Sequence, residues 1–268
     1  MSGNGKAVAT RDTTLKSLLK QAEARIADVA PKHMDAARFI RLANLAINKV
    51  PKLQQADQLS IISAVMDAAR LGLEIGRECH LVPFYDSKSK KTMCQLIPDY
   101  KGIIKLMVNA GVKSVDARVV REGDLFEVQY GSTPYIQHEP KLGSQEPRKV
   151  VAYYSVAHMG RDVPPKVEVM EPWEVDAIRN RSKAKDHGPW KTDPEEMGKK
   201  TVVKRMGKQI PQSPEVAEIL EMDNRFESGR VGSFLPQDTP KAIAAGATEA
   251  TEEAAEDLRA RLEEQAET

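Results

Sequence analysis

The spacing of hydrophobic residues changes twice along this chain, and that change limits the folds it can form. Apolar residues recur every three or four positions from Leu15 onward, which predicts a first helix and two more at 34–48 and 55–71, with a stop at Gly72. Between residues 79 and 170 the spacing becomes that of strands, and helical spacing then returns. A chain of 268 residues with 41% hydrophobic content can bury one sizeable core, or one core and an appendage.

Gly and Pro signals divide the strand-like region. The first two strands are joined by residues 86–91, a polar and basic connection suited to a hairpin. Strands are expected at 79–85, 92–97, 115–121, 124–130, 149–158 and 165–170, and further helices at 99–110, 172–180, 193–208 and 213–223.

Composition separates the two ends of the chain from its middle. After residue 226 a linker rich in Gly, Ser, Pro and Ala leads into a segment rich in Glu and Ala, which has too few large apolar residues to pack a core. The expected parts are a disordered start at 1–12, a core at 13–226 with N-terminal helices at 13–72 and a mixed region at 73–226, and a flexible acidic tail at 227–268.

The net charge of +1 conceals an uneven distribution. Residues 239–268 carry eight acidic and three basic residues, a net charge of −5, which leaves +6 for residues 1–238. Residues 179–208 alone contain ten basic and four acidic residues, so this segment has a net charge of +6 and the rest of the body is balanced. A localised basic patch of this kind favours a polyanionic partner.

The helix expected at 193–208 carries a row of basic residues beside an apolar face. The row includes Lys200, Lys204, Arg205 and Lys208. Trp190, one of two tryptophans, stands just before this helix, and an aromatic ring beside basic residues can hold single-stranded nucleic acid by stacking and charge neutralisation. The same pattern also fits a surface helix whose lysines are solvated and whose tryptophan fills a core.

Recognisable catalytic motifs are missing from the sequence. There is no G-x-x-x-x-G-K-[ST] phosphate loop, and the five histidines lack metal-ligand spacing. Asp99 is placed to cap the following helix, and Asp124 lies in a turn between two expected strands. We therefore expect a binding protein without enzymatic activity, metal or cofactor.

The sequence gives no sign of a membrane segment, because no apolar run reaches the ~18 residues that a spanning helix needs. The N-terminus is polar and lacks the apolar core of a signal peptide. With only two cysteines, Cys79 and Cys94, a disulfide framework is not expected. These features favour a cytoplasmic protein.

Short motifs spread over residues 71–201 resemble, in order, those of the RecT and Redβ family of phage single-strand annealing proteins. The motifs are Leu71-Gly72-Leu73, Val82-Pro83-Phe84, Gln95-Leu96-Ile97, Tyr100-Lys101-Gly102, Glu122-Gly123-Asp124 with Phe126, Gly131, His138 with Pro140, Pro189-Trp190, and Met197 with Lys200-Thr201. Each motif alone is weak, but their common order makes the resemblance specific.

The resemblance implies an α+β fold in which a curved antiparallel β-sheet packs on helices, similar to the core of the eukaryotic strand-annealing mediator. It implies a homo-oligomeric ring or helical filament that binds single-stranded DNA and anneals complementary strands without ATP during phage recombination. The partners it implies are a phage exonuclease and the host single-strand-binding protein, in the cytoplasm of a bacterial host.

Annealing is slowed by phosphate repulsion and by the search for register, and a cationic groove that holds one strand extended would lower both barriers. We expect such a groove to have a clamp, a mouth and an opposite wall. The clamp comprises Lys199, Lys200, Lys204, Arg205 and Lys208, the mouth Trp190 and Lys191, and the wall Lys101, Lys105, Arg118 and Arg121. The alternative for each of these cations is an ordinary solvated side chain.

A separate basic segment precedes the clamp. Arg179, Arg181, Lys183 and Lys185 lead into a sequence typical of a flexible loop, which could close over DNA, reach a neighbouring subunit or have no role. Two other classes of function fit parts of the pattern. An RNA-binding oligomer would share the basic patches, and a metal-dependent nuclease could use Asp193, Glu195 and Glu196, although helical spacing beside lysines favours salt bridges for these carboxylates.

Overall fold

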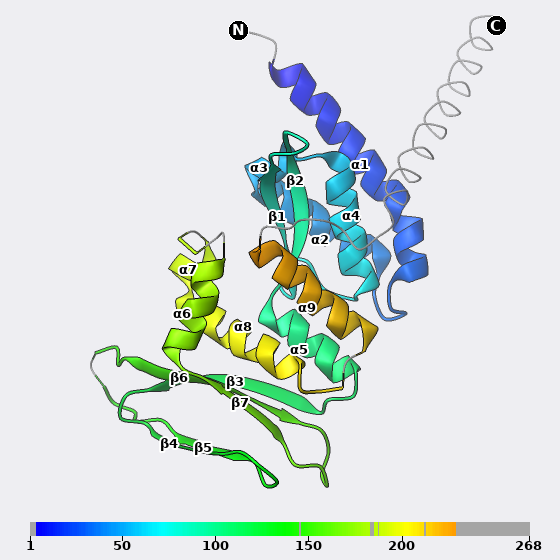
Figure 1. Cartoon of the computed structure of the whole chain (residues 1–268). Coiled ribbons are helices and arrows are strands. Elements are labelled where there is room, and N and C mark those ends of the chain that lie inside the picture. The colour runs from blue at the N-terminus through cyan, green and yellow to red at the C-terminus, as the bar shows by residue number, and fades with distance from the viewer. Residues whose placement is uncertain (1–3, 145, 183–184, 187, 212, 229–268) are drawn as a thin grey trace, which may run out of the picture. The chain divides into compact units, whose positions relative to one another are not determined.

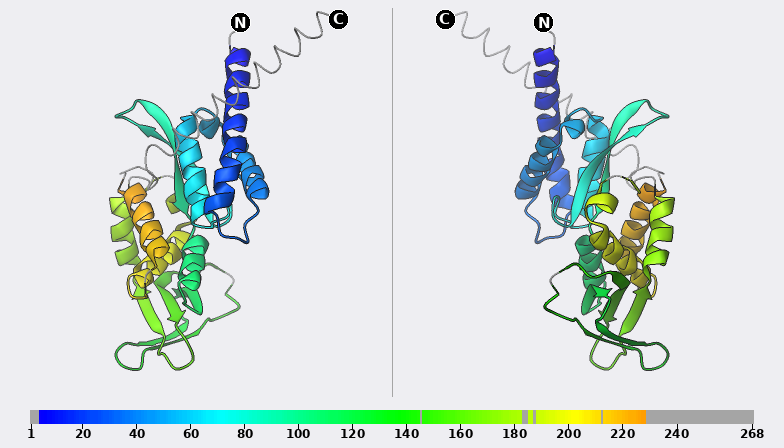
Figure 2. Two further views of the ribbon diagram at one scale, coloured as in Figure 1. Left: turned by 90° about the vertical axis from the view of Figure 1, so that its right-hand side faces the viewer. Right: turned by 90° about the vertical axis from the view of Figure 1, so that its left-hand side faces the viewer.

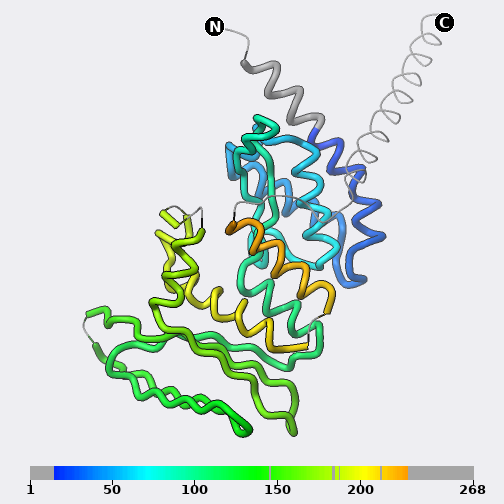
Figure 3. The backbone as a smooth tube through the Cα atoms, viewed as in Figure 1, coloured from blue at the N-terminus to red at the C-terminus, as the bar shows by residue number. Residues whose placement is uncertain are grey.

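The computed structural model describes residues 4–144, 146–182, 185–186, 188–211 and 213–228, with side chains from residue 15 onward (Figure 1; the backbone is traced in Figure 3). The chain divides into two compact units, with a boundary between Leu96 and Ile97. The tail expected at 227–268 lies outside the described residues from residue 229 onward.

The first unit consists of helices and one two-stranded sheet, β1 with β2. Its elements are α1 (Asn4–Val29), α2 (Ala36–Lys49), α3 (Pro51–Gln54), α4 (Gln58–Arg70), β1 (Cys79–Asp86) and β2 (Lys91–Pro98). Asp35 and Asp57 begin α2 and α4 as N-caps, because their carboxylates accept the backbone N–H of Arg38 and Ser60. Residues 4–12, which composition predicts to be disordered, form the start of α1.

The apolar face predicted for the first helix forms the core of this unit. Leu19, Ala22 and Ile26 on α1 are fully buried, and α1 packs against α2 and α4. Cys79 on β1 and Cys94 on β2 are buried thiols that are not bridged, and burial raises the pKa of Cys94 to about 12.

The second unit contains an antiparallel sheet, a separate hairpin and the remaining helices (Figures 1 and 2). Its elements are α5 (Tyr100–Asn109), β3 (Ser114–Arg121), β4 (Leu125–Gln129), β5 (Tyr135–Glu139), β6 (Val150–His158), β7 (Lys166–Met170), α6 (Pro172–Arg181), α7 (Pro189–Thr192), α8 (Pro194–Gly207) and α9 (Pro214–Glu227). Proline at the first position of α6, α8 and α9 suits a helix start, where its missing N–H is not needed.

The sheet has the order β3-β6-β7, and both of its faces are covered. Tyr153 on the central strand packs with Val202 of α8, while Tyr154, its neighbour, packs with Phe126 of the β4–β5 hairpin on the opposite face. The helix approaches closely because residue 198 is glycine: a Cβ at Gly198 would overlap the ring of Tyr153. Figure 1 shows the resulting layers, with the hairpin below the sheet and α8 above it.

One buried carboxylate fixes the base of the hairpin. Asp124 accepts hydrogen bonds from the backbone N–H groups of Arg121 and Lys141, each at 2.8 Å, and from the guanidinium of Arg148 at 2.6 Å. His138 of β5 lies 3.1 Å from the same carboxylate. Burial alone would raise the pKa of Asp124, but these hydrogen bonds outweigh it and hold the pKa well below its usual range.

The structure confirms a mixed fold of helices and antiparallel sheet. The strand β5 and the short helices α3 and α7 were not expected from the sequence. None of the helices in the described part of the chain is long and apolar enough to cross a membrane.

Candidate nucleic-acid interface

The basic helix α8 lies between the sheet, which covers one side, and α5 and α9, which pack on others. Positions nine residues apart on a helix differ by about 900°, half a turn beyond two full turns. Lys199 and Lys208 therefore point to opposite sides of α8. The basic residues that the sequence places on one helix do not form a single continuous stripe.

Lys200 and Lys204 are held in an ion-pair cluster with α9. The carboxylate of Asp223, which is fully buried, lies 2.6 Å from the Nζ atoms of both lysines, and Glu227 lies 3.1 Å from Lys204. Burial alone would raise the pKa of Asp223, but the two ammonium groups outweigh it and lower that pKa. Burial would likewise lower the pKa of Lys204, but Asp223 and Glu227 outweigh it and raise that pKa.

This cluster corrects the prediction of an exposed phosphate clamp. Only 8% of the surface of Lys200 is accessible, and its charge is already matched by Asp223. A phosphate could reach this lysine only by displacing a buried carboxylate, which would leave that carboxylate unpaired. Lys200 and Lys204 therefore join α8 to α9.

Arg205 is also paired. Its guanidinium lies 2.9 Å from Glu168 of β7 and 2.6 Å from Glu174 of α6, so it joins three elements. The hydrogen bond from Arg205 to Glu174 raises the pKa of the arginine. Burial raises the pKa of Glu168, whose carboxylate also accepts a hydrogen bond from Gln209.

Trp190 does not stand at a groove mouth. It is only 3% exposed and packs with Tyr153, Val175 and Val202 in the core between the sheet and α8. The alternative interpretation, in which this tryptophan fills a core, is the one that the structure shows. Lys191, the next residue, is exposed on α7.

The structure brings Lys101 and Lys199 to the same aromatic ring. The Nζ atom of Lys199 lies 5.5 Å from the ring centroid of Tyr100, and that of Lys101 lies 5.9 Å from it. Both contacts are within the range of a cation–π interaction. Lys199 also lies 2.5 Å from Glu196. Lys105, on the same helix as Lys101, is half-buried.

The two arginines of β3 lie on different faces of the sheet. Arg121 pairs with Glu195 of α8 at 2.7 Å, which raises the pKa of the arginine. Arg118 is exposed and lies opposite Tyr154 in the strand register, so it is on the face that the hairpin covers. Of the basic loop, Lys185 is exposed, its carbonyl accepts a hydrogen bond from Arg179, and Lys183 lies outside the described residues.

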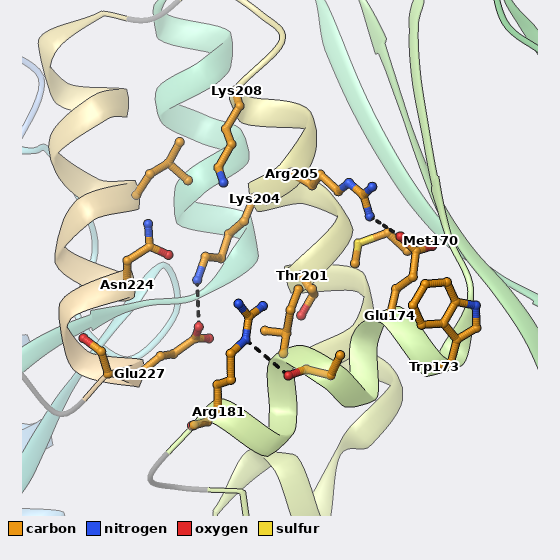
Figure 4. A pocket seen from close by; sticks show the side chains of 15 residues that line it. Met170, Trp173, Glu174, Arg181, Thr201, Lys204, Arg205, Lys208, Asn224 and Glu227 are labelled. Atoms are coloured by element: carbon orange, nitrogen blue, oxygen red, sulfur yellow. Dashed lines mark hydrogen bonds and ion pairs between the residues drawn. The ribbon is translucent and has the colours of Figure 1, made fainter.

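A cleft of about 720 Å³ opens between α6, α8 and α9, and we call it the Trp173 cleft (Figure 4). Its basic lining residues are Arg181, Lys204, Arg205 and Lys208, and its acidic ones are Glu174 and Glu227, which gives the lining a formal net charge of +2. Figure 4 shows the pairing of Lys204 with Glu227 and of Arg205 with Glu174 within the cleft. It shows Arg181 and Lys208 outside those pairs.

Sequence reasoning missed Trp173. This indole is 66% exposed, in contrast to Trp190, and its N–H donates to Glu171 at 2.8 Å. Helical spacing could have linked this tryptophan to the basic residues, because Trp173, Ala177 and Arg181 follow one another every four residues on one side of α6. All three residues line the cleft.

The described residues contain no group of three or more His, Cys, Asp or Glu side chains that could hold a metal ion.

Comparison with known proteins identifies the family. The chain matches the model of the RecT family over residues 37–231. It is 37% identical over 231 residues to the protein named Protein RecT from Escherichia coli strain K12, and the alignment covers 83% of this chain and 85% of that protein. The resemblance predicted from the short motifs is thereby confirmed, and the chain belongs to the RecT family.

Proposed function

We propose that this protein binds single-stranded DNA and anneals complementary strands in phage homologous recombination, without ATP. The observation that carries the proposal is membership of the RecT family, which supports recombination and single-strand annealing in general. The family match covers the basic helix α8 and the elements that surround it.

The surface of the second unit provides support of a physical kind. Lys101 and Lys199 meet at the ring of Tyr100, and Arg181 and Lys208 line the Trp173 cleft on the other side of α8. Cations at these positions would neutralise phosphates of a bound strand and release its counterions. A second strand would then meet less repulsion, so pairing would proceed without any bond being made or broken by the protein.

The proposal extends to assembly and partners. The protein acts as a homo-oligomer, a ring or a helical filament, in which neighbouring copies extend the DNA-binding surface. The acidic tail at 227–268 docks partner proteins, namely a phage exonuclease and the host single-strand-binding protein, in the bacterial cytoplasm. The tail's net negative charge suits this role better than contact with DNA.

The order in which strands are added tests annealing directly. Complementary oligonucleotides added one after the other, with no nucleotide triphosphate, should give a complex that dissociates more slowly than one with a single strand or a preformed duplex. The reason is that pairing within the bound state adds base stacking, about 1.4 kcal/mol per step, to the protein contacts. Gel-shift and dissociation-rate measurements provide the comparison.

Two results would contradict the proposal. If a preformed duplex bound as tightly and as long as sequentially added strands, the protein would be a general DNA binder. If RNA and DNA of matched length bound equally and neither was annealed, an RNA-binding oligomer would fit better.

A further inference from the structure

We propose that the Trp173 cleft binds a short segment of single-stranded DNA, with one unpaired base stacked on Trp173 and the neighbouring phosphates held by Arg181 and Lys208. The inference rests on the proposed function and adds to it a base-contacting site. It assigns to Trp173 the stacking role that the sequence suggested for Trp190.

Trp173 presents a ring that is exposed and oriented before any ligand binds. It is the more exposed of the two tryptophans, at 66%. Its backbone lies in the first turn of α6 and is held there by the helix. The carboxylate of Glu171 accepts a hydrogen bond from the indole N–H. The backbone N–H of Glu171 in turn donates a hydrogen bond to the carboxylate of Glu174 at 2.9 Å. A held ring loses little conformational freedom on binding, which favours stacking of a base.

The basic residues that line the cleft divide into paired and available cations. Lys204 and Arg205 are each bonded to carboxylates that line the same cleft, so they form a neutral wall. Arg181 donates to the backbone carbonyl of Ala177 at 3.3 Å, which leaves its remaining N–H groups for a ligand. Within the described part of the chain, no carboxylate lies at ion-pair distance from Arg181 or Lys208. These two cations are therefore placed to hold phosphates.

The combination of ring and cations favours a single strand over other polyanions. The bases of a duplex are already stacked on their neighbours, so their faces are not accessible to an indole. An acidic peptide would satisfy Arg181 and Lys208 but would make no use of the exposed ring face. A volume of about 720 Å³ lies within the range of small-molecule sites and suits a base with its adjoining phosphates.

The two tryptophans provide an internal control, because one is exposed and the other buried. An oligothymidine titration should quench the fluorescence of wild-type protein and of Trp190→Phe, since Trp173 remains in both. The same titration should leave Trp173→Phe unquenched, because its only indole is then Trp190 in the core. If Trp190→Phe does not fold, comparing the quenching of wild-type protein with that of Trp173→Phe is sufficient for the test.

Affinity gives an independent measure. Trp173→Ala should weaken binding of oligothymidine roughly tenfold, within the range for loss of one stacked base, and Trp173→Phe should recover most of it. Binding of a duplex should not change. Tyr135→Ala, which removes an exposed aromatic ring from β5, is the matched control and should bind like wild type.

The outcomes separate this inference from the proposed function. Normal affinity and normal annealing by Trp173→Ala would overturn the inference and leave the annealing proposal standing. If oligothymidine quenched Trp173 but the protein did not anneal strands, the inference would stand and the annealing proposal would fail. Quenching of Trp173 by a peptide of residues 249–265, with none by oligothymidine, would assign the cleft to the acidic tail and overturn the inference.

Discussion

At the scale of single residues, the position of Asp223 decides what two of the basic side chains can do. Its buried carboxylate holds Lys200 and Lys204 at 2.6 Å, and both lysines thereby serve the contact between α8 and α9. A lysine in a strongly basic segment of the sequence can thus have a structural role. The distinction depends on one acidic residue that follows Lys200 by 23 positions.

We predict that Asp223→Asn destabilises the protein at neutral pH by about 3–5 kcal/mol, because it leaves the buried ammonium group of Lys200 without a carboxylate and that of Lys204 with Glu227 alone. The pKa of Asp223 is lower in the folded protein than its usual 3.8, so its stabilising contribution is present above that pH and is lost as the pH falls further. Urea unfolding of wild type and variant at several pH values measures this. A difference in stability between wild type and Asp223→Asn that stays constant down to pH 2 would contradict the prediction. The control is Glu221→Gln, which changes an exposed carboxylate on the same helix.

At the scale of elements, the contact between α8 and the sheet depends on a glycine. Gly198 lies against the ring of Tyr153, whereas Gly207, on the same helix, lies against the flexible end of Met107. The first contact sets how closely the helix can approach β6.

Gly198→Ala should therefore destabilise the second unit by about 1–3 kcal/mol, in spite of the ~1 kcal/mol that alanine gains over glycine in a helix. Gly207→Ala should cost less, because Met107 can move aside. Thermal unfolding of the two variants gives the comparison. A Gly198→Ala variant as stable as the wild type would show that the helix can shift away from Tyr153 at no cost.

The spacing of apolar residues predicts most of these helices and strands, but it does not predict which face of each one is exposed. Helix α8 was expected at 193–208 and is observed at Pro194–Gly207, because caps and apolar spacing are local properties. Strand β5 was missed because Pro134 and Pro140 flank only five residues of strand. The exposure of Trp173 and the burial of Trp190 depend on how distant segments pack, and a single sequence does not contain that information.

At the scale of the whole molecule, the proposed binding of single-stranded DNA is supported by family membership and by the cations on the surface of the second unit. The match to the RecT family covers residues 37–231, and so includes both units. Lys101 at Tyr100 and Lys208 in the Trp173 cleft lie on different parts of this surface, and the proposed function assigns phosphates to both.

This arrangement predicts different effects for Lys200 of α8 and for Lys208, which directly follows that helix. Lys208→Gln should lower the slope of log affinity against log salt by about 0.7, the value for one phosphate contact to a single strand. Lys200→Gln should leave that slope unchanged and lower thermal stability, because Lys200 is paired with buried Asp223. Fluorescence titrations at several salt concentrations, below the melting temperature of both variants, measure the slopes. Equal slopes for the two variants would place both lysines, or neither, on DNA.

The division of the chain into two units also distributes its spectroscopic probes. Both cysteines, Cys79 and Cys94, are buried in the first unit, and both tryptophans, Trp173 and Trp190, belong to the second. A thiol with a pKa raised to about 12 reacts slowly with alkylating reagents until its surroundings open. The rate of thiol labelling therefore reports opening of the first unit, while indole emission reports opening of the second. The order in which the two units open can thus be followed with the side chains that the chain already has, without introducing a cysteine or a tryptophan.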